Sequence, residues 1–186
     1  ASAGDTEARD ILAAYGVTLP KSALARDADE AVAAAEAIGY PVVMKIASPD
    51  ILHKSDVGGV ILNIADLSSL QSAYTQMVKR VKEAKPEARI DGVHIQQQIP
   101  DGQEVIVGMV RDPQFGALMM FGSGGVEVEG LKDVAFALAP LNLIEAEEMI
   151  RKTWAGRKLK GFRNIPPVDE ESVIDVLVKL SQLAIE

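Results

Sequence analysis

The chain has 186 residues, of which 48% are hydrophobic and 25% are charged, which is enough apolar sequence for a folded core. The formal net charge of -8 lacks the basic surface that nucleic-acid binding requires. No apolar run reaches the roughly 18 residues that span a bilayer, and the start of the chain lacks the features of a signal peptide. We therefore expect a cytoplasmic protein with no nucleic-acid or membrane partner.

Residue types limit the metal chemistry. The chain has no cysteine and two histidines, so any metal would be held by oxygen ligands. The chain begins at Ala1, and it ends at Glu186 inside a helical pattern without Gly, Asn or Pro to stop it. We interpret it as part of a longer protein.

The first half alternates helical and extended patterns. Caps and apolar spacing predict helices from Asp5 to Gly16, from the Asp27 cap to Ile38, and from the Asp66 cap to Pro86. Between and after them, runs rich in Val and Ile predict strands. These strands cover residues 41–46, 60–64 and 92–99.

The second half starts with strands and ends with helices. Strands are predicted at 104–110, 117–121 and 134–138, followed by helices at 144–154 and, after the Asp169 cap, to the end. Short links at Pro100–Gly102 and Arg111–Pro113 favour antiparallel neighbours. The expected class is α+β with antiparallel or mixed sheets and flanking helices, divided into lobes of residues 1–98 and 99–186.

One polar segment between two strands, residues 47–60, holds His53 and the pair Gly58-Gly59. A neutral imidazole in a mobile loop can act as a nucleophile toward phosphorus, and glycines allow backbone to approach a bound group. The alternative is a surface hairpin with an exposed histidine. Spacing alone favours that alternative, because His-Lys-Ser-Asp matches no general catalytic pattern.

Three further features could bind an anion or a sugar. Lys45 lies inside an apolar strand, where it either meets an anion or reaches solvent or a carboxylate. Glycines from Gly122 to Gly125 could direct backbone amides at an anion, but taken alone the run favours a plain flexible turn. Glu104 shares a strand face with Ile106, and its carboxylate could accept from sugar hydroxyls or only face solvent. His94, also in a strand, is interpreted as structural.

Taken together, four long segments resemble the ATP-grasp domain of the nucleoside-diphosphate-forming acyl-CoA synthetases, related to the β subunit of succinyl-CoA synthetase. The match runs nearly the whole chain. The segments are GYPVVMKI at 39–46, SPDILHKSDVGGV at 48–60, EVIVGMVRDPQFG at 104–116 and FGSGGVEVEGLKD at 121–133.

The resemblance implies an ATP-grasp fold whose two lobes bind ATP or ADP. It implies that Lys45 reaches the phosphates, that Gln97 and Ile99 lie in the hinge beside adenine, and that Glu104 accepts from the ribose. Gly122, Gly124 and Gly125 would belong to the phosphate loop. The family's Mg²⁺ ligands are expected beyond Glu186, so no metal ligand is assigned within this chain.

The same resemblance implies an acid–CoA ligase (ADP-forming) that is a part of a larger chain or complex. His53 would relay a phosphoryl group to and from a second histidine on a CoA-binding subunit or fused domain. The 186 residues alone would be inactive. The alternative is a regulatory ATP-grasp module of a protein lysine acetyltransferase.

Overall fold

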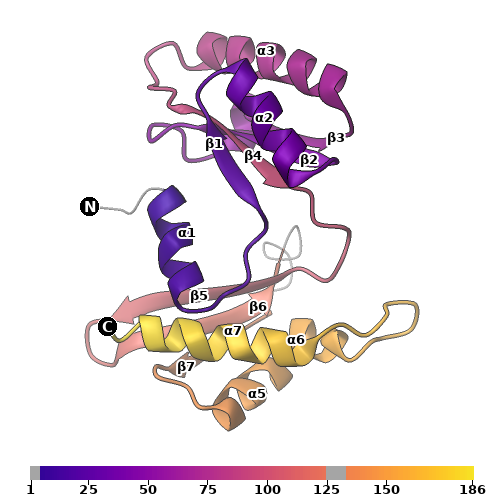
Figure 1. Ribbon diagram of the computed structural model, residues 1–186. Helices are drawn as coiled ribbons and strands as arrows, with labels where there is room; N and C mark the ends of the chain where they lie inside the picture. Colours follow the sequence, from indigo (N-terminus) through magenta and orange to yellow (C-terminus); the bar gives the residue numbers. More distant parts are fainter. Residues whose placement is uncertain (1–4, 125–132) are drawn as a thin grey trace. The chain divides into compact units, whose positions relative to one another are not determined.

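Residues 5–124 and 133–186 are described by the computed structural model, and their contacts form two compact units. One unit is the continuous segment Leu19–Pro100, and the other joins the leading segment, through Thr18, to Asp101–Glu186. Figure 1 shows the course of the chain through both. Each unit is described separately below.

The Leu19–Pro100 unit contains a four-stranded antiparallel sheet in the order β1-β4-β2-β3. Helices α2 and α3 pack on one face of this sheet (Figure 1), and a short 3₁₀ helix, η1, lies between β2 and β3. The bounds are β1 Ser22–Ala25, α2 Ala28–Ile38, β2 Val42–Ala47, η1 Lys54–Val57, β3 Val60–Ile64, α3 Leu67–Ala84 and β4 Gly92–Gln97.

Local caps explain where the two helices of this unit begin. The Asp27 side chain accepts from the Glu30 N–H at 2.8 Å, and Asp66 forms a reciprocal capping box with Ser69. The buried side chains of both helices meet alternate residues of β2 and β4. The core includes Ala31, Ala35, Leu70, Met77, Val81, Val42, Met44, Ile46, Val93 and Ile95.

The second unit contains a three-stranded antiparallel sheet in the order β5-β6-β7. Its core joins one sheet face to the helices α5, α6 and α7 (Figure 1). The bounds are α1 Asp5–Ala14, β5 Val105–Asp112, β6 Gly116–Ser123, β7 Val134–Leu138, α5 Leu143–Arg151, α6 Trp154–Leu159 and α7 Glu170–Leu183. The predicted α+β class with antiparallel sheets and flanking helices is confirmed.

Three expectations about the chain's division differ from the contacts in the structure. The leading helix groups with the second unit, because Tyr15 donates to Glu186 and the Gly16 carbonyl accepts from Lys179. Pro100–Gly102 does not close a hairpin, since β4 and β5 belong to different sheets. The unit boundary falls at Pro100 instead of residue 98.

Two elements differ from prediction. Strand β1 is absent from the expected elements because Ser-Ala-Leu-Ala has low strand propensity, and only its pairing with β4 makes it a strand. The helix predicted over 144–154 is interrupted, since the Thr153 hydroxyl donates to the Ile150 carbonyl and accepts from the Gly156 N–H. Thr153 therefore starts a new helix, α6.

None of the helices in the described ranges combines the length and apolar content that crossing a bilayer requires.

Candidate functional site

Lys45 lies on the face of the four-stranded sheet opposite the α2 and α3 core, because its neighbours Met44 and Ile46 point into that core. Its Nζ donates to Gln96 Oε1 at 3.0 Å. In the antiparallel register Lys45 lies opposite His94. This face therefore carries a cationic group on β2 and two further polar side chains, His94 and Gln96, on the neighbouring strand β4.

The predicted hinge follows directly along β4. Gln97 makes two hydrogen bonds with Lys21. Its backbone N–H donates to the Lys21 carbonyl at 2.8 Å, and its side-chain Oε1 accepts from the Lys21 N–H at 3.3 Å. Gln98 makes paired hydrogen bonds with Asn63, both 2.9 Å long. Ile99 lies just past the strand with 56% of its surface exposed. The hinge thus offers an exposed apolar side chain beside amides held in place by the protein.

His53 is exposed, and it lies immediately before η1. Ile51 is buried and anchors the segment, whereas Leu52 is 88% exposed. The segment therefore presents two consecutive side chains, Leu52 and His53, outward from a buried residue.

The glycine pair after η1 has a packing role. A Cβ on Gly59 would meet Ile46 Cγ2 at 2.6 Å and the Lys54 carbonyl oxygen at 2.9 Å. Gly58 has φ 66°, a left-handed conformation that favours glycine. These glycines let the segment turn back tightly against β2.

The second unit has an open sheet face of apolar residues. Since α5, α6 and α7 pack against the alternate residues, this face carries side chains that those helices leave uncovered. Val110, Val134, Phe136 and Leu138 are 45–52% exposed there. The cross-strand rows of this face are Ile106–Gly122–Val134, Gly108–Met120–Phe136 and Val110–Leu118–Leu138.

Glu104 directly precedes β5. Strand alternation places its side chain on the same open face as Ile106, as predicted. The residue is exposed. Its backbone carbonyl accepts from the Gly124 N–H at 3.0 Å. A carboxylate thus stands at the end of an apolar surface and beside the predicted glycine run.

The glycines of that run have close neighbours. A Cβ on Gly122 would meet the Asp133 carbonyl oxygen at 2.3 Å, and one on Gly124 would meet Glu104 carbonyl carbon at 2.8 Å. The Ser123 and Gly124 amides donate to the carbonyls of Asp133 and Glu104. The expectation that amides converge on an anion therefore does not hold for these two amides, which are bonded within the protein. Gly125 lies outside the described residues.

Asp133 was not among the predicted site residues. Its carboxylate accepts from the Trp154 and Ala155 N–H groups at 2.7 Å each and from the Ser123 hydroxyl at 3.0 Å. Burial raises the pKa of Asp133, but these hydrogen bonds and the charge of Arg157 outweigh it and lower the pKa. Only the fold could reveal these contacts, because they join residues 10 to 22 positions apart.

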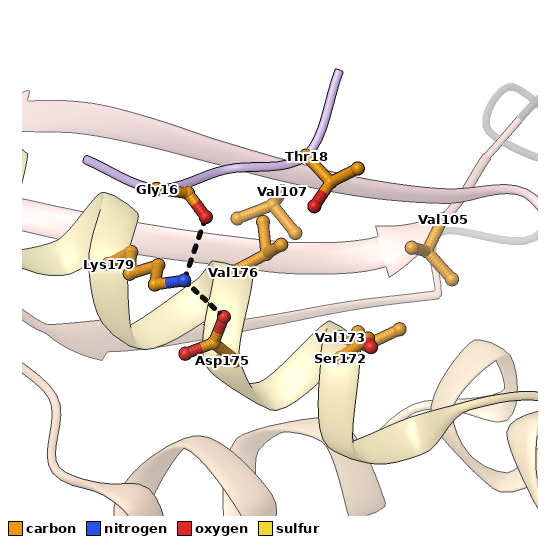
Figure 2. Close-up of a pocket in the computed structure, with 9 residues that line it drawn as sticks. All are labelled: Gly16, Thr18, Val105, Val107, Ser172, Val173, Asp175, Val176 and Lys179. Carbon is orange, nitrogen blue, oxygen red and sulfur yellow. Dashed lines mark hydrogen bonds and ion pairs between the residues drawn. The ribbon is translucent and has the colours of Figure 1, made fainter. Parts of the chain in front are cut away.

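A pocket of about 440 Å³ lies elsewhere in the same unit, beside α7 (Figure 2). Four valines line it, together with the Lys179 side chain, which bonds to the Gly16 carbonyl at 2.8 Å and to Asp175 at 2.6 Å. None of the predicted site residues lines this pocket.

The predicted residues thus form two groups. Glu104, Gly122 and Gly124 lie together in the second unit, whereas Lys45, His53, Gln97 and Ile99 belong to the Leu19–Pro100 unit. Within residues 5–124 and 133–186, no three His, Asp or Glu side chains are grouped closely enough to hold a metal ion.

Known proteins match this chain over nearly its whole length. A family model described as an ATP-grasp domain matches residues 2–186. The β subunit of acetate–CoA ligase [ADP-forming] I from Pyrococcus furiosus is 47% identical over 182 residues, which are 98% of this chain and 78% of that protein. Acetate–CoA ligase [ADP-forming] I from Archaeoglobus fulgidus is 47% identical over 180 residues. Those residues are 97% of this chain but 26% of that protein, so the chain spans about a quarter of its length.

Solved structures of dinucleotide forming acetyl-coenzyme A synthetase 1 from Ca. Korarchaeum cryptofilum are also similar. A complex with coenzyme A, Ca-AMPCP and HgCl+ has a TM-score of 0.93 and 42% identity, covering 97% of this chain and 79% of that chain. A complex with coenzyme A and Mg-AMPPCP has a TM-score of 0.84 and 39% identity, covering 97% and 78%. In the second complex a phosphohistidine segment points towards the nucleotide-binding site.

With a family model that spans the chain and relatives that match both its sequence and its fold, the chain belongs to the ATP-grasp family, where it corresponds to the β-subunit portion of ADP-forming acetate–CoA ligases.

Proposed function

We propose that this chain is the nucleotide-binding part of an ADP-forming acid–CoA ligase, which converts acyl-CoA, ADP and phosphate to acid, CoA and ATP. The similarity to the Pyrococcus furiosus β subunit supports the reaction class. The observation that carries the nucleotide assignment is the apolar open face of the β5-β6-β7 sheet, which ends at the exposed carboxylate of Glu104. An apolar surface suits a base, and a carboxylate suits sugar hydroxyls.

Each unit has residues with a role toward a nucleotide in this proposal. Lys45 contacts the phosphates as a point charge, and the hinge at Gln97 and Ile99 lies against adenine. Glu104 accepts from the ribose. The support is chemical: Lys45 is half-buried on the helix-free face of its sheet, and Ile99 is exposed beside fixed amides.

The glycine run supplies close packing in this proposal. Gly122 and Gly124 allow Asp133 and Glu104 to approach the backbone of β6. The chain's own groups bind and orient the nucleotide. The Korarchaeum cryptofilum complex with Mg-AMPPCP supports the presence of Mg²⁺ with the nucleotide.

His53 is proposed as the phosphoryl carrier. In the direction of ATP formation its neutral ring nitrogen attacks the phosphorus of a phosphohistidine on the CoA-binding partner, forming one P–N bond as the other breaks. An oxygen of the ADP β-phosphate then attacks phospho-His53, a P–O bond forms, and the imidazole leaves. Exposure of His53 next to a buried anchor supports this role.

The partner is proposed to be a CoA-binding subunit or a fused domain. The 26% coverage of the Archaeoglobus fulgidus ligase and the 78% coverage of the Pyrococcus furiosus β subunit fit both arrangements. The alternative, a regulatory module of a lysine acetyltransferase, finds no support among these relatives.

The test uses the complete enzyme with its CoA-binding part and γ-labelled ATP. Label is expected on His53 in a bond that is stable in base and lost in acid. His53→Ala should abolish both labelling and ATP formation and leave the Kd for ADP nearly unchanged. His94→Gln serves as the control histidine and should keep the label. Full turnover by His53→Ala would refute the relay.

A further inference from the structure

Asp133 joins three parts of the second unit that are distant in sequence. One carboxylate oxygen accepts from the Trp154 N–H, and the other accepts from the Ala155 N–H and the Ser123 hydroxyl. Its backbone carbonyl also accepts from the Ser123 N–H at 3.3 Å. A single residue thus ties the end of β6 to the start of α6.

The contacts continue from Asp133 to Glu104. Ser123 is 3% exposed, so its bonds to Asp133 are shielded from water. The next residue, Gly124, donates its N–H to the Glu104 carbonyl at 3.0 Å. A Cβ on Gly124 would lie 2.9 Å from the Glu104 Cβ, so this backbone approaches Glu104 as closely as only glycine allows.

We propose that Asp133 is a positioning residue for Glu104: through Ser123 and Gly124 it holds the Glu104 backbone in the place from which the carboxylate binds the ribose of the nucleotide. This inference rests on the proposed nucleotide binding. Asp133 itself does not touch the nucleotide. Its effect on affinity passes through the backbone of residues 123 and 124.

The chain offers a matched control in the same unit. Asp169 also caps a helix, α7, and bonds to a serine, accepting from the Ser172 N–H at 3.0 Å and from its hydroxyl at 2.6 Å. Both oxygens of each carboxylate accept hydrogen bonds, and asparagine replaces one of these acceptor oxygens with a donor NH₂ group. Only Asp133 is bonded to the residue next to Gly124.

The first measurement is ADP affinity by calorimetry on the full chain. Asp133→Asn should raise the Kd for ADP by about two- to tenfold, the range for losing one or two net hydrogen bonds. Asp169→Asn should leave it within about twofold of wild type. Ser123→Ala, a milder change, should also raise the Kd for ADP. It is the variant to measure if Asp133→Asn fails to fold.

A double-mutant cycle separates positioning from general destabilisation. Glu104→Gln and Asp133→Asn should be non-additive in ADP affinity, because each removes the same ribose contact. Glu104→Gln and Asp169→Asn should be additive. With 2′,3′-dideoxy-ADP, which lacks the ribose hydroxyls, Asp133→Asn should bind as well as wild type.

A second readout needs no nucleotide. The hydrogen-exchange rate of the Gly124 amide should be higher in Asp133→Asn than in wild type. In Asp169→Asn the rate should equal that of wild type. Additive effects with Glu104→Gln, or equal losses for ADP and the dideoxy analogue, would overturn the positioning role. If wild type shows no ADP binding, the proposed function fails instead, and the exchange result still decides whether Asp133 holds residue 124.

Discussion

The Lys45 ammonium donates to the Gln96 side-chain oxygen at 3.0 Å, across two antiparallel strands of one sheet. The bond holds a long, flexible side chain on the sheet face that α2 and α3 leave uncovered. The bond to the amide orients the ammonium on this face.

Lys45→Ala should weaken ADP binding by about 1.5–3 kcal/mol, the range for a hydrogen bond to a charged group. Isothermal titration calorimetry on the full chain measures this change. Lys79→Ala is the control, because its exposed ammonium pairs with Glu83 on α3. Equal affinity of wild type and Lys45→Ala would contradict the phosphate role.

Gly122→Ala should destabilise the protein by roughly 1–3 kcal/mol, because the added methyl group would meet the Asp133 carbonyl oxygen at 2.3 Å. Urea unfolding measures the loss. Gly102→Ala, in the same unit, should have little effect since nothing lies within 4 Å of its added Cβ. Indistinguishable unfolding midpoints for the two variants would refute the close packing of β6 against Asp133.

The stability of the second unit should depend on pH through Asp133. Because hydrogen bonds lower its folded pKa below the usual 3.8, the ionised form stabilises the fold above that value. The contribution is lost as pH falls below 3.8 through the folded pKa. Urea unfolding between neutral and acidic pH should therefore show a smaller acid-dependent loss in Asp133→Asn than in wild type.

Other aspartates also contribute to the acid-dependent loss of stability. Hydrogen bonds to Ser69 and Ser172 also lower the pKa values of Asp66 and Asp169. Asp133→Asn should thus flatten the acid limb only in part. An unchanged limb would contradict a folded pKa of Asp133 that lies below its unfolded value.

The segment Leu19–Pro100 should fold on its own, because it contains a complete sheet, two helices and a separate core. Circular dichroism and thermal unfolding of residues 19–100 test this. Within it, Leu70→Ala should cost about 2–5 kcal/mol, since Leu70 is fully buried. Leu67→Ala, at a 41% exposed position of the same helix, should cost much less. A non-cooperative transition would show that the segment depends on the rest of the chain.

Features with local causes were predictable from the sequence. The starts after Asp27, Asp66 and Asp169 follow from side chains that accept hydrogen bonds three residues ahead. Of the seven strands among the described residues, six followed from short apolar runs, and the face shared by Glu104 and Ile106 followed from strand alternation. The family followed from long ordered segments around Lys45, His53 and Glu104.

Features with non-local causes were decided only by the tertiary structure. The pairing of β1 with β4, the contact of α1 with α7, and the bonds of Asp133 to Ser123 and Trp154 join residues that no local pattern connects. The glycines illustrate the same limit. In the sequence, a glycine shows only that no side chain is present. In the fold, this absence allows Gly122 to pack closely against Asp133 and Gly124 to pack closely against Glu104.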